Sequence, residues 1–308
     1  MKTRLLALAT LALTLAACSN DDENNNQIAA RFSAEISDAT LTRAAGTSWH
    51  ENDEIGITAT QNAAMSQYTN VKYTTEKNDG NFTGSPIYFQ NNQNVTFTAY
   101  YPFSGTEGNP AGKLIPKTEA TNQTPTNQKN IDFLFAEAQD KNCNNANVTF
   151  KFHHKMSQIT LTFIAGDDIS FSGTEISYSL EGLRMSGEFD TSNGTATATG
   201  ETAETLTINN VTLSNSSATV APVILYPQDI TEVNGINQIK LSVILDGQTY
   251  SCDLEIDKEE GSGTEKLTEL EAGNNYTFEI TISKTGLTLN KSDIIGWNSV
   301  KGTGTAEM

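Results

Sequence analysis

Apolar and polar residues alternate with a period of two along most of the chain. This period places successive side chains on opposite faces of a β-strand, so each run predicts a strand with one buried face. The runs in the first half cover residues 28–36, 55–59, 95–101, 148–152 and 159–163, and those in the second half cover 206–213, 220–225, 239–245, 250–256 and 276–282. No window longer than ten residues has the 3.6-residue period of a helix. Residues 130–139 and 264–271 are the best candidates for a helical turn.

Many short strands separated by polar turns predict an all-β fold of the sandwich or barrel type. Asp246-Gly247 separates two alternating runs and predicts a tight hairpin, because both turn positions need a positive φ. A length of 308 residues suits two such units in tandem. We place the boundary after the Asn-rich stretch 140–145, to within about ten residues. This gives an N-terminal β-sandwich domain at 28–146 and a C-terminal one at 147–308.

The N-terminus predicts export as a lipoprotein. A basic start is followed by an apolar stretch at 5–15, which is too short to span a bilayer as a helix but fits a secretory signal. The signal peptide, residues 1–17, ends in Leu-Ala-Ala before Cys18, which resembles a bacterial lipobox. Cys18 would then be acylated and would anchor the protein to the outer membrane through lipid. An ordinary signal peptide that contains a cysteine is the alternative.

Residues 18–27 are acidic and rich in Asn, which predicts a flexible tether. A cysteine followed closely by acidic residues resembles the surface-export signal of lipoproteins in the Bacteroidetes. We therefore expect a surface-exposed outer-membrane lipoprotein, with a plain linker as the alternative reading of this segment.

Composition excludes several classes of function. A net charge of −18 and a pI near 4.5 argue against nucleic-acid binding, which needs a basic surface. Three His and three Cys show no metal-ligand spacing, and no acidic run has the spacing of a calcium-binding loop, although a loop calcium ion stays open. Neither a nucleophile elbow nor a phosphate-binding loop is present. We expect no enzyme activity, metal or cofactor, and keep a carboxylate-based hydrolase as a remote alternative.

Arg43 stands out because basic residues are scarce and small residues flank it in Leu41–Gly46. It follows the strand at 28–36 and precedes Trp49, in a segment that we predict to be a loop. Exposed loops with small residues are preferred protease sites. An ordinary surface arginine is the alternative.

An ordered set of motifs resembles the fimbrillin-like proteins of the Bacteroidales. Residues 49–57 (WHENDEIGI) resemble the family's W-x-x-G-D-x-I-G-I, with Asn52 where the family often has Gly. Further similar segments follow in the family's order at 68–73, 97–102, 133–136, 152–157, 270–276 and 295–297. The resemblance covers nearly the whole chain after the tether and implies two tandem transthyretin-like β-sandwich domains.

The resemblance also implies a route of assembly. An Arg-specific protease would cut after Arg43 and leave Ala44 as the new N-terminus. The first strand would be a removable edge strand that fills a groove through Ile28, Ala30, Phe32, Ala34 and Ile36. A strand from the next subunit would then restore the hydrogen-bonded ladder, and the head-to-tail contact would propagate a filament. The candidate donor is the C-terminal segment 285–300, with the anchors Leu287, Leu289, Ile294 and Ile295, although polar residues at 291–293 interrupt it.

The leading hypothesis is therefore a fimbrial subunit or a tip or accessory protein that supports adhesion, located at the outer membrane and in the fimbrium once processed. Its expected partners are other fimbrial subunits, the Arg-specific protease and a host or glycan receptor. The alternative is a surface lipoprotein that binds a glycan or host ligand and never polymerises. Tyr88 or Tyr100-Tyr101 would then stack on the ligand, unless they belong to the core.

Overall fold

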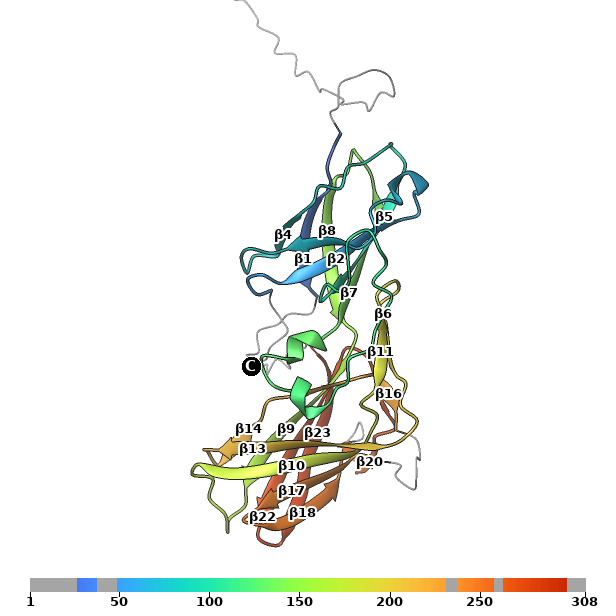
Figure 1. Cartoon of the computed structure of the whole chain (residues 1–308). Coiled ribbons are helices and arrows are strands. Elements are labelled where there is room, and N and C mark those ends of the chain that lie inside the picture. The colour runs from blue at the N-terminus through green and yellow to red at the C-terminus, as the bar shows by residue number, and fades with distance from the viewer. Residues whose placement is uncertain (1–26, 38–48, 231–237, 258–262, 298–308) are drawn as a thin grey trace, which may run out of the picture.

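The computed structural model describes residues 27–37, 49–230, 238–257 and 263–297, which form an elongated molecule with two lobes (Figure 1). The described chain is all-β, as predicted. Its helical structure consists of the three short 3-10 helices η1 (Ala63–Met65), η2 (Ala120–Asn122) and η3 (Gln128–Asn130). The expectation of helical turns at 130–139 and 264–271 was wrong, since these residues mainly form strands. None of the described helices has the length and apolar character needed to cross a membrane.

The first lobe is a closed barrel of seven strands. Around the barrel the order is β1-β4-β3-β2-β5-β7-β8, and β8 pairs again with β1. The strands are β1 (Arg31–Ile36), β2 (Glu54–Thr60), β3 (Val71–Thr74), β4 (Asn81–Gly84), β5 (Val95–Tyr101), β7 (Leu134–Lys141) and β8 (Asn147–His154). The apolar positions of all seven strands meet in one core inside the barrel. The two facing sheets of the predicted sandwich are thus joined at both edges.

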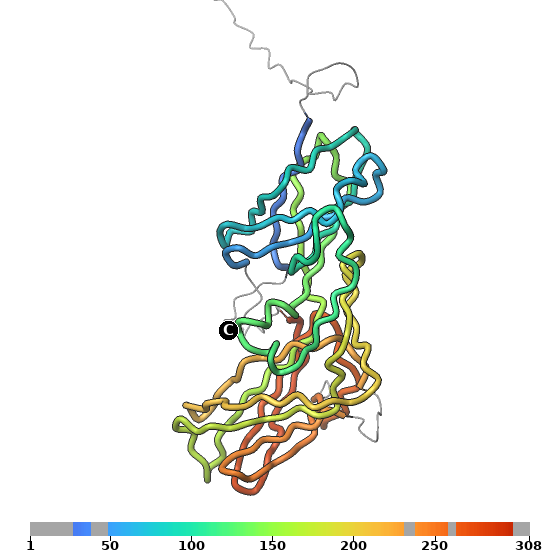
Figure 2. The backbone as a smooth tube through the Cα atoms, in the orientation of Figure 1, coloured from blue at the N-terminus to red at the C-terminus, as the bar shows by residue number. Residues whose placement is uncertain are grey.

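The second lobe is a sandwich of two sheets (Figure 2). Its buried apolar residues form a core separate from that of the barrel. One sheet has the order β13-β10-β17-β18, from β13 (Glu204–Leu213), β10 (Thr174–Leu183), β17 (Lys240–Leu245) and β18 (Gln248–Asp253). The other has the order β14-β9-β22-β23, from β14 (Ser217–Thr219), β9 (Ser157–Ala165), β22 (Asn274–Ser283) and β23 (Gly286–Gly296), and β15 (Val223–Leu225) also pairs with β9.

Smaller sheets lie beside these two bodies. β6 (Lys113–Leu114) pairs with β11 (Gly187–Asp190), which pairs with β12 (Thr195–Ala198), so the first half of the chain adds a strand to the second. Two further pairs join β16 (Gln228–Asp229) to β21 (Glu269–Leu270) and β19 (Glu255–Asp257) to β20 (Thr264–Lys266). A third apolar cluster fills the junction, where the rings of Phe133 and Phe189 stack with centroids 4.6 Å apart.

The strand pairing puts the change from the first lobe to the second between His154 and Ser157, later than residue 146 but within the margin of the predicted boundary. β8 (Asn147–His154) belongs to the first barrel, because it pairs with β1 and β7, and the second lobe begins with β9 at Ser157. The Asn-rich stretch is the turn between β7 and β8, closed by a bridge between Asn142 and Asn145. Composition alone does not distinguish a polar turn inside one sheet from a linker between two lobes.

The hairpin predicted at Asp246-Gly247 is present. Their φ angles are 50° and 77°, and β17 pairs with β18 directly across the turn, from Leu245 to Gln248. Cys252 on β18 packs against the second core and is a free thiol.

The protection of Cys252 gives a first prediction. Burial, with a smaller contribution from the Asp253 carboxylate, raises the pKa of Cys252 from 9.0 to about 11. Because the thiolate is the reactive form, we expect alkylation by iodoacetamide at pH 8 to be about 100-fold slower in the folded chain than in urea. The rate in the folded chain should rise as the pH approaches 11. Peptide mass mapping measures this rate, and equal rates in the folded and unfolded chain would contradict the prediction.

Candidate functional site

The buried face of β1 forms part of the barrel core. Phe32, Ala34 and Ile36 of β1 are buried, as is Ala30 directly before it, and the alternating residues Arg31 and Glu35 are exposed. Ile28, which was expected to belong to the same face, is 37% exposed and lies just before the strand. The alternation read from the sequence therefore describes β1 correctly from residue 30 onward.

Phe32 is the centre of the aromatic packing in this core. Its ring meets Tyr73 and Phe97 edge-on, with centroids 4.9 and 5.2 Å apart, and stacks parallel to Phe150 at 5.8 Å. These three partners come from β3, β5 and β8, so one side chain of β1 touches strands from all around the barrel. Filling this position with a large ring is therefore the main apolar contribution of β1.

β1 is paired along both of its edges. It runs parallel to β8 over six residue pairs from Arg31–Asn147 to Ile36–Phe152, and it meets β4 in antiparallel fashion at two pairs. The contact with β8 also includes a hydrogen bond between the hydroxyls of Ser33 and Thr149 and a 3.6 Å ion pair between Glu35 and Lys151. The expectation of an edge strand was thus wrong, because β1 is the strand that closes the barrel.

A close approach near Gly80 fixes the other edge of β1. The Ala34 amide donates to the Gly80 carbonyl at 2.8 Å, and the Trp49 Nε1–H donates to the Ala34 carbonyl at 2.9 Å. A Cβ on Gly80 would lie 2.2 Å from that same carbonyl oxygen, and Gly80 has a φ of 72°. Glycine is thus required here both by the backbone angle and by the distance to β1.

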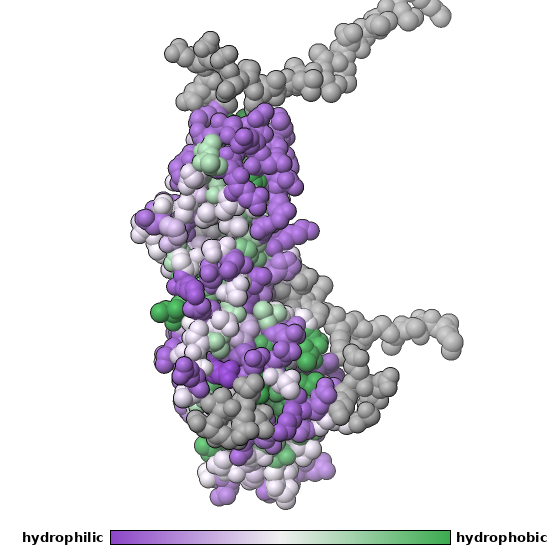
Figure 3. All heavy atoms as spheres, turned by 90° about the vertical axis from the view of Figure 1, so that its right-hand side faces the viewer, coloured by the Kyte–Doolittle hydropathy of each residue, from purple (hydrophilic) through white to green (hydrophobic). Residues whose placement is uncertain are grey.

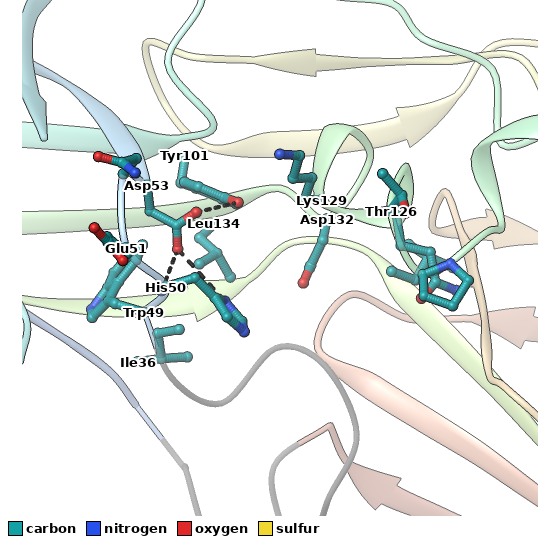
Figure 4. A pocket seen from close by; sticks show the side chains of 14 residues that line it. Ile36, Trp49, His50, Glu51, Asp53, Tyr101, Thr126, Lys129, Asp132 and Leu134 are labelled. Atoms are coloured by element: carbon teal, nitrogen blue, oxygen red, sulfur yellow. Dashed lines mark hydrogen bonds and ion pairs between the residues drawn. The ribbon is translucent and has the colours of Figure 1, made fainter. Parts of the chain in front are cut away.

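A cleft of about 530 Å³ lies at the end of β1 next to the junction of the lobes (Figure 4). Ile36 ends β1 at this cleft, and the segment from Trp49 to Asp53 re-enters the fold along it. The opposite wall contains the stretch from Pro125 to Asp132, together with Ile224. The two ends of the connection between β1 and β2 thus meet the second lobe around one cavity.

The polar groups around Asp53 in the cleft form hydrogen bonds with one another. Asp53 accepts a hydrogen bond from the Tyr101 hydroxyl at 3.2 Å and from the backbone amide of His50 at 2.8 Å (Figure 4). Burial, assisted by Asp53, raises the pKa of Tyr101, so its hydroxyl stays protonated and donates at neutral pH.

A second buried pair stands beside this cleft. The Asp132 carboxylate is 2.7 Å from His154 Nδ1, and the His154 ring stacks on Trp297 with centroids 4.4 Å apart. His154 is thus held both by a polar contact and by ring stacking. No group of three His, Cys, Asp or Glu side chains within the described ranges is arranged to hold a metal ion.

The other candidate residues from the sequence lie elsewhere or outside the described residues. Leu287, Leu289, Ile294 and Ile295 are all in β23, which pairs with β22 in the second lobe. Cys18, Arg43 and Ala44 lie outside the described residues.

The proposed aromatic platform is not exposed. Tyr100 and Tyr101 are both buried, Tyr100 in the junction cluster and Tyr101 in the barrel core, and Tyr88 is half-buried. Polar side chains dominate the view of the first lobe in Figure 3. Two of the three tyrosines considered for glycan stacking, Tyr100 and Tyr101, are therefore buried and do not form an exposed surface.

Sequence reasoning did not identify Gly80 or the role of Trp49 in holding β1. In the sequence, Trp49 stands out as part of a motif, and nothing in the sequence links it or Gly80 to the first strand. The one available signal was the pair Asp79-Gly80, which is typical of a turn. Which strand such a turn approaches is set by the tertiary structure.

The comparisons with known proteins decide the family. The sequence profile of the fimbrillin-like family matches residues 42–297. The chain belongs to the fimbrillin-like family.

Solved structures extend this likeness to the whole fold. A candidate cell adhesion protein from Bacteroides ovatus is 26% identical with a TM-score of 0.72, and the match covers 89% of this chain and 99% of that one. Another candidate cell adhesion protein, from Bacteroides uniformis, is 24% identical with a TM-score of 0.68, over 88% and 99% of the two chains. No curated protein sequence matches the chain.

The fimbrillin-like match begins after β1. It starts at residue 42 and ends at Trp297, so the strand that closes the barrel lies N-terminal to the matched region. β1, which completes the core of the first lobe, thus lies outside the region that the family profile matches.

Proposed function

We propose that this fimbrillin-like protein is a subunit, or a tip or accessory protein, of a surface fimbrium and acts in adhesion. In this proposal it is exported as a lipoprotein anchored through Cys18, cut after Arg43 by an Arg-specific protease, and assembled when a strand from another subunit replaces β1. The observation that carries the proposal is that the core of the first lobe is completed by a strand outside the family-matched region.

Replacement of β1 is physically reasonable because of what its loss would uncover. The backbone groups of β4 and β8 that face β1 would lose their partners, and the site of Phe32 would open among Tyr73, Phe97 and Phe150. Unpaired strand edges and an apolar trough are a template for an added strand. Because β1 has a neighbour on each side, a donor can pair with two strands at once.

Pairing on both sides also means that the uncut chain stays closed. An edge strand dissociates when its hydrogen bonds to one neighbouring strand break. β1 dissociates only when its hydrogen bonds to both β8 and β4 break. While β1 is covalently joined to the barrel it rebinds at a high effective concentration. Cleavage after Arg43 removes this advantage, so the proposal assigns the timing of assembly to the protease.

The anchoring end suits a surface protein. The described chain begins just before β1, at the free end of the first lobe and far from the second lobe (Figure 1). Residues 18–27 extend at most about 35 Å, so a lipid on Cys18 would hold this end near the membrane. Cleavage after Arg43 would separate the anchor from the barrel.

Cleavage gives the second prediction. We expect intact-mass analysis of assembled surface material to show chains that begin at Ala44, and Arg43→Ala to leave the chain uncut and absent from fibres. Arg184→Ala is the matched control, because this arginine lies in the second lobe and should not affect processing. Fibres built from chains that still begin at Cys18 would contradict the proposal.

A further inference from the structure

We infer that the strand which replaces β1 comes from a different polypeptide, with small, aromatic, small and aliphatic residues at four alternating positions. This inference rests on the proposed replacement of β1 and adds the identity of the partner. In this inference the subunit is an acceptor in a mixed assembly, and neither β23 nor residues 298–308 of a second copy serve as its donor.

The buried side chains of β1 define the required sequence. The methyl groups of Ala30 and Ala34 are buried in the barrel core. Ile36, the last of the four buried residues, lies at the cleft. Between the two alanines, Phe32 fills a site surrounded by three aromatic rings. A donor with a large residue at an alanine position overfills the core, and a donor with a small residue at position 32 leaves a cavity.

The direction of entry is also set by the fold. β1 runs parallel to β8 from the free end of the first lobe toward the junction (Figure 2). Ile36 at its end lines the cleft next to the second lobe. A donor from another subunit therefore enters at the free end. If it enters as a C-terminal tail, it runs in the same direction as β1 and reproduces the same register.

The C-terminal strand of this chain is already used in its own fold. β23 pairs with β22 from Asn274–Gly296 to Ser283–Gly286, and Leu287 and Leu289 pack against the second core. Buried Ser292 exchanges two hydrogen bonds with Asp257, at 2.6 and 2.9 Å.

β23 also has the wrong pattern for the groove. The alternating set that contains Leu287 and Leu289 continues with Lys291 and Asp293. A lysine or aspartate would then occupy a position that is apolar in β1, where burial of an unpaired charge is unfavourable.

The residues after Trp297 do not match the groove either. Their best register places Gly302, Gly304, Ala306 and Met308 at the positions of the four buried side chains of β1. Small residues then stand at both alanine positions and a flexible apolar residue replaces Ile36, but glycine stands at the position of Phe32. Trp297 offers no substitute, because it is buried against His154.

The proposed test uses the full mature chain and short peptides. Arg31→Lys and Arg184→Lys leave Arg43 as the sole arginine after the signal peptide, so an Arg-specific protease cuts once. The cut protein is then incubated with fluorescent peptides that carry residues 28–37, residues 298–308, or 298–308 with Gly304→Phe. Gly302→Phe in the same peptide is the matched control, because it places the ring at an alanine position. Fluorescence anisotropy reports peptide uptake, and mass spectrometry reports release of the fragment 18–43.

We expect uptake of the 28–37 peptide and at least about 100-fold weaker uptake of the 298–308 peptide, because the latter leaves the aromatic site empty. Gly304→Phe should restore most of the uptake, and Gly302→Phe should not. Equal uptake of the 28–37 and unmodified 298–308 peptides would overturn the inference while leaving strand replacement intact. Failure of Gly304→Phe to improve uptake would overturn the rule for the aromatic position. If the 28–37 peptide is not taken up and fragment 18–43 never leaves, the proposed function itself fails.

Discussion

Phe32→Ala is expected to lower the free energy of unfolding of the first lobe by about 3–5 kcal/mol, the usual cost of removing a buried phenylalanine ring. Phe32 touches the rings of Tyr73, Phe97 and Phe150, so its removal leaves a cavity lined by three strands that cannot easily collapse. Urea unfolding followed by the fluorescence of Trp49, which is buried in the same core, measures the change.

Two variants separate this effect from general damage. Ile28→Ala truncates a partly exposed residue just before β1 and should cost less than about 1 kcal/mol. Phe163→Ala makes a similar cavity in the core of the second lobe and should leave the Trp49 transition in place. If Phe32→Ala costs no more than Ile28→Ala, the aromatic site is not what holds β1 in the barrel.

The strands themselves could be predicted from the sequence where one face is buried and the other is wet. From Ala30 to Ile36 every second residue is buried, so the period of the sequence is also the period of burial. The hairpin at Asp246-Gly247 was predictable for a local reason, since two adjacent residues with positive φ specify the turn directly.

Prediction was less successful where a second layer covers a strand. β5 alternates Thr96 and Thr98 with apolar residues, which is typical of a half-exposed strand, yet all seven of its residues are buried. The outer face of β5 is covered at the junction, where Tyr100 joins a cluster with residues from both halves of the chain. The sequence of one strand does not show whether other residues cover its outer face. Tyr100 and Tyr101 were therefore considered as an exposed platform for a ligand.

The neighbours of β1 could not be predicted, because they are distant in sequence. β1 pairs with β8, more than a hundred residues away, and with β4, where Phe32 lies opposite Phe82. Alternation specifies which face of a strand is buried but not which strands lie beside it, so the barrel-closing position of β1 was missed. The candidate site was thus predictable as a strand with a defined buried face, and its pairing was not.

Gly80→Ala is expected to destabilise the first lobe by about 2–5 kcal/mol and to loosen β1 in particular. An alanine at a φ of 72° costs about 1–2 kcal/mol in backbone strain, and forcing a methyl group into packed atoms adds about 1–3 kcal/mol. The nearest atom is the Ala34 carbonyl oxygen, 2.2 Å from the added Cβ, so the backbone of β1 must move. The hydrogen bond from the Ala34 amide to the Gly80 carbonyl should weaken as a result.

Gly247→Ala is the matched control, because it has nearly the same φ of 77° but no atom within 4 Å of the added Cβ. It should cost only the backbone strain and should leave β1 unchanged. Hydrogen exchange at the Ala34 amide measures the difference: exchange should be faster in Gly80→Ala than in the parent chain and unaffected in Gly247→Ala. After cleavage at Arg43, the same ranking should hold for release of the fragment 18–43. Equal exchange in the two variants would show that the approach of Gly80 to Ala34 does not control the closing strand, and strand replacement would then be governed by the pairing with β8 alone.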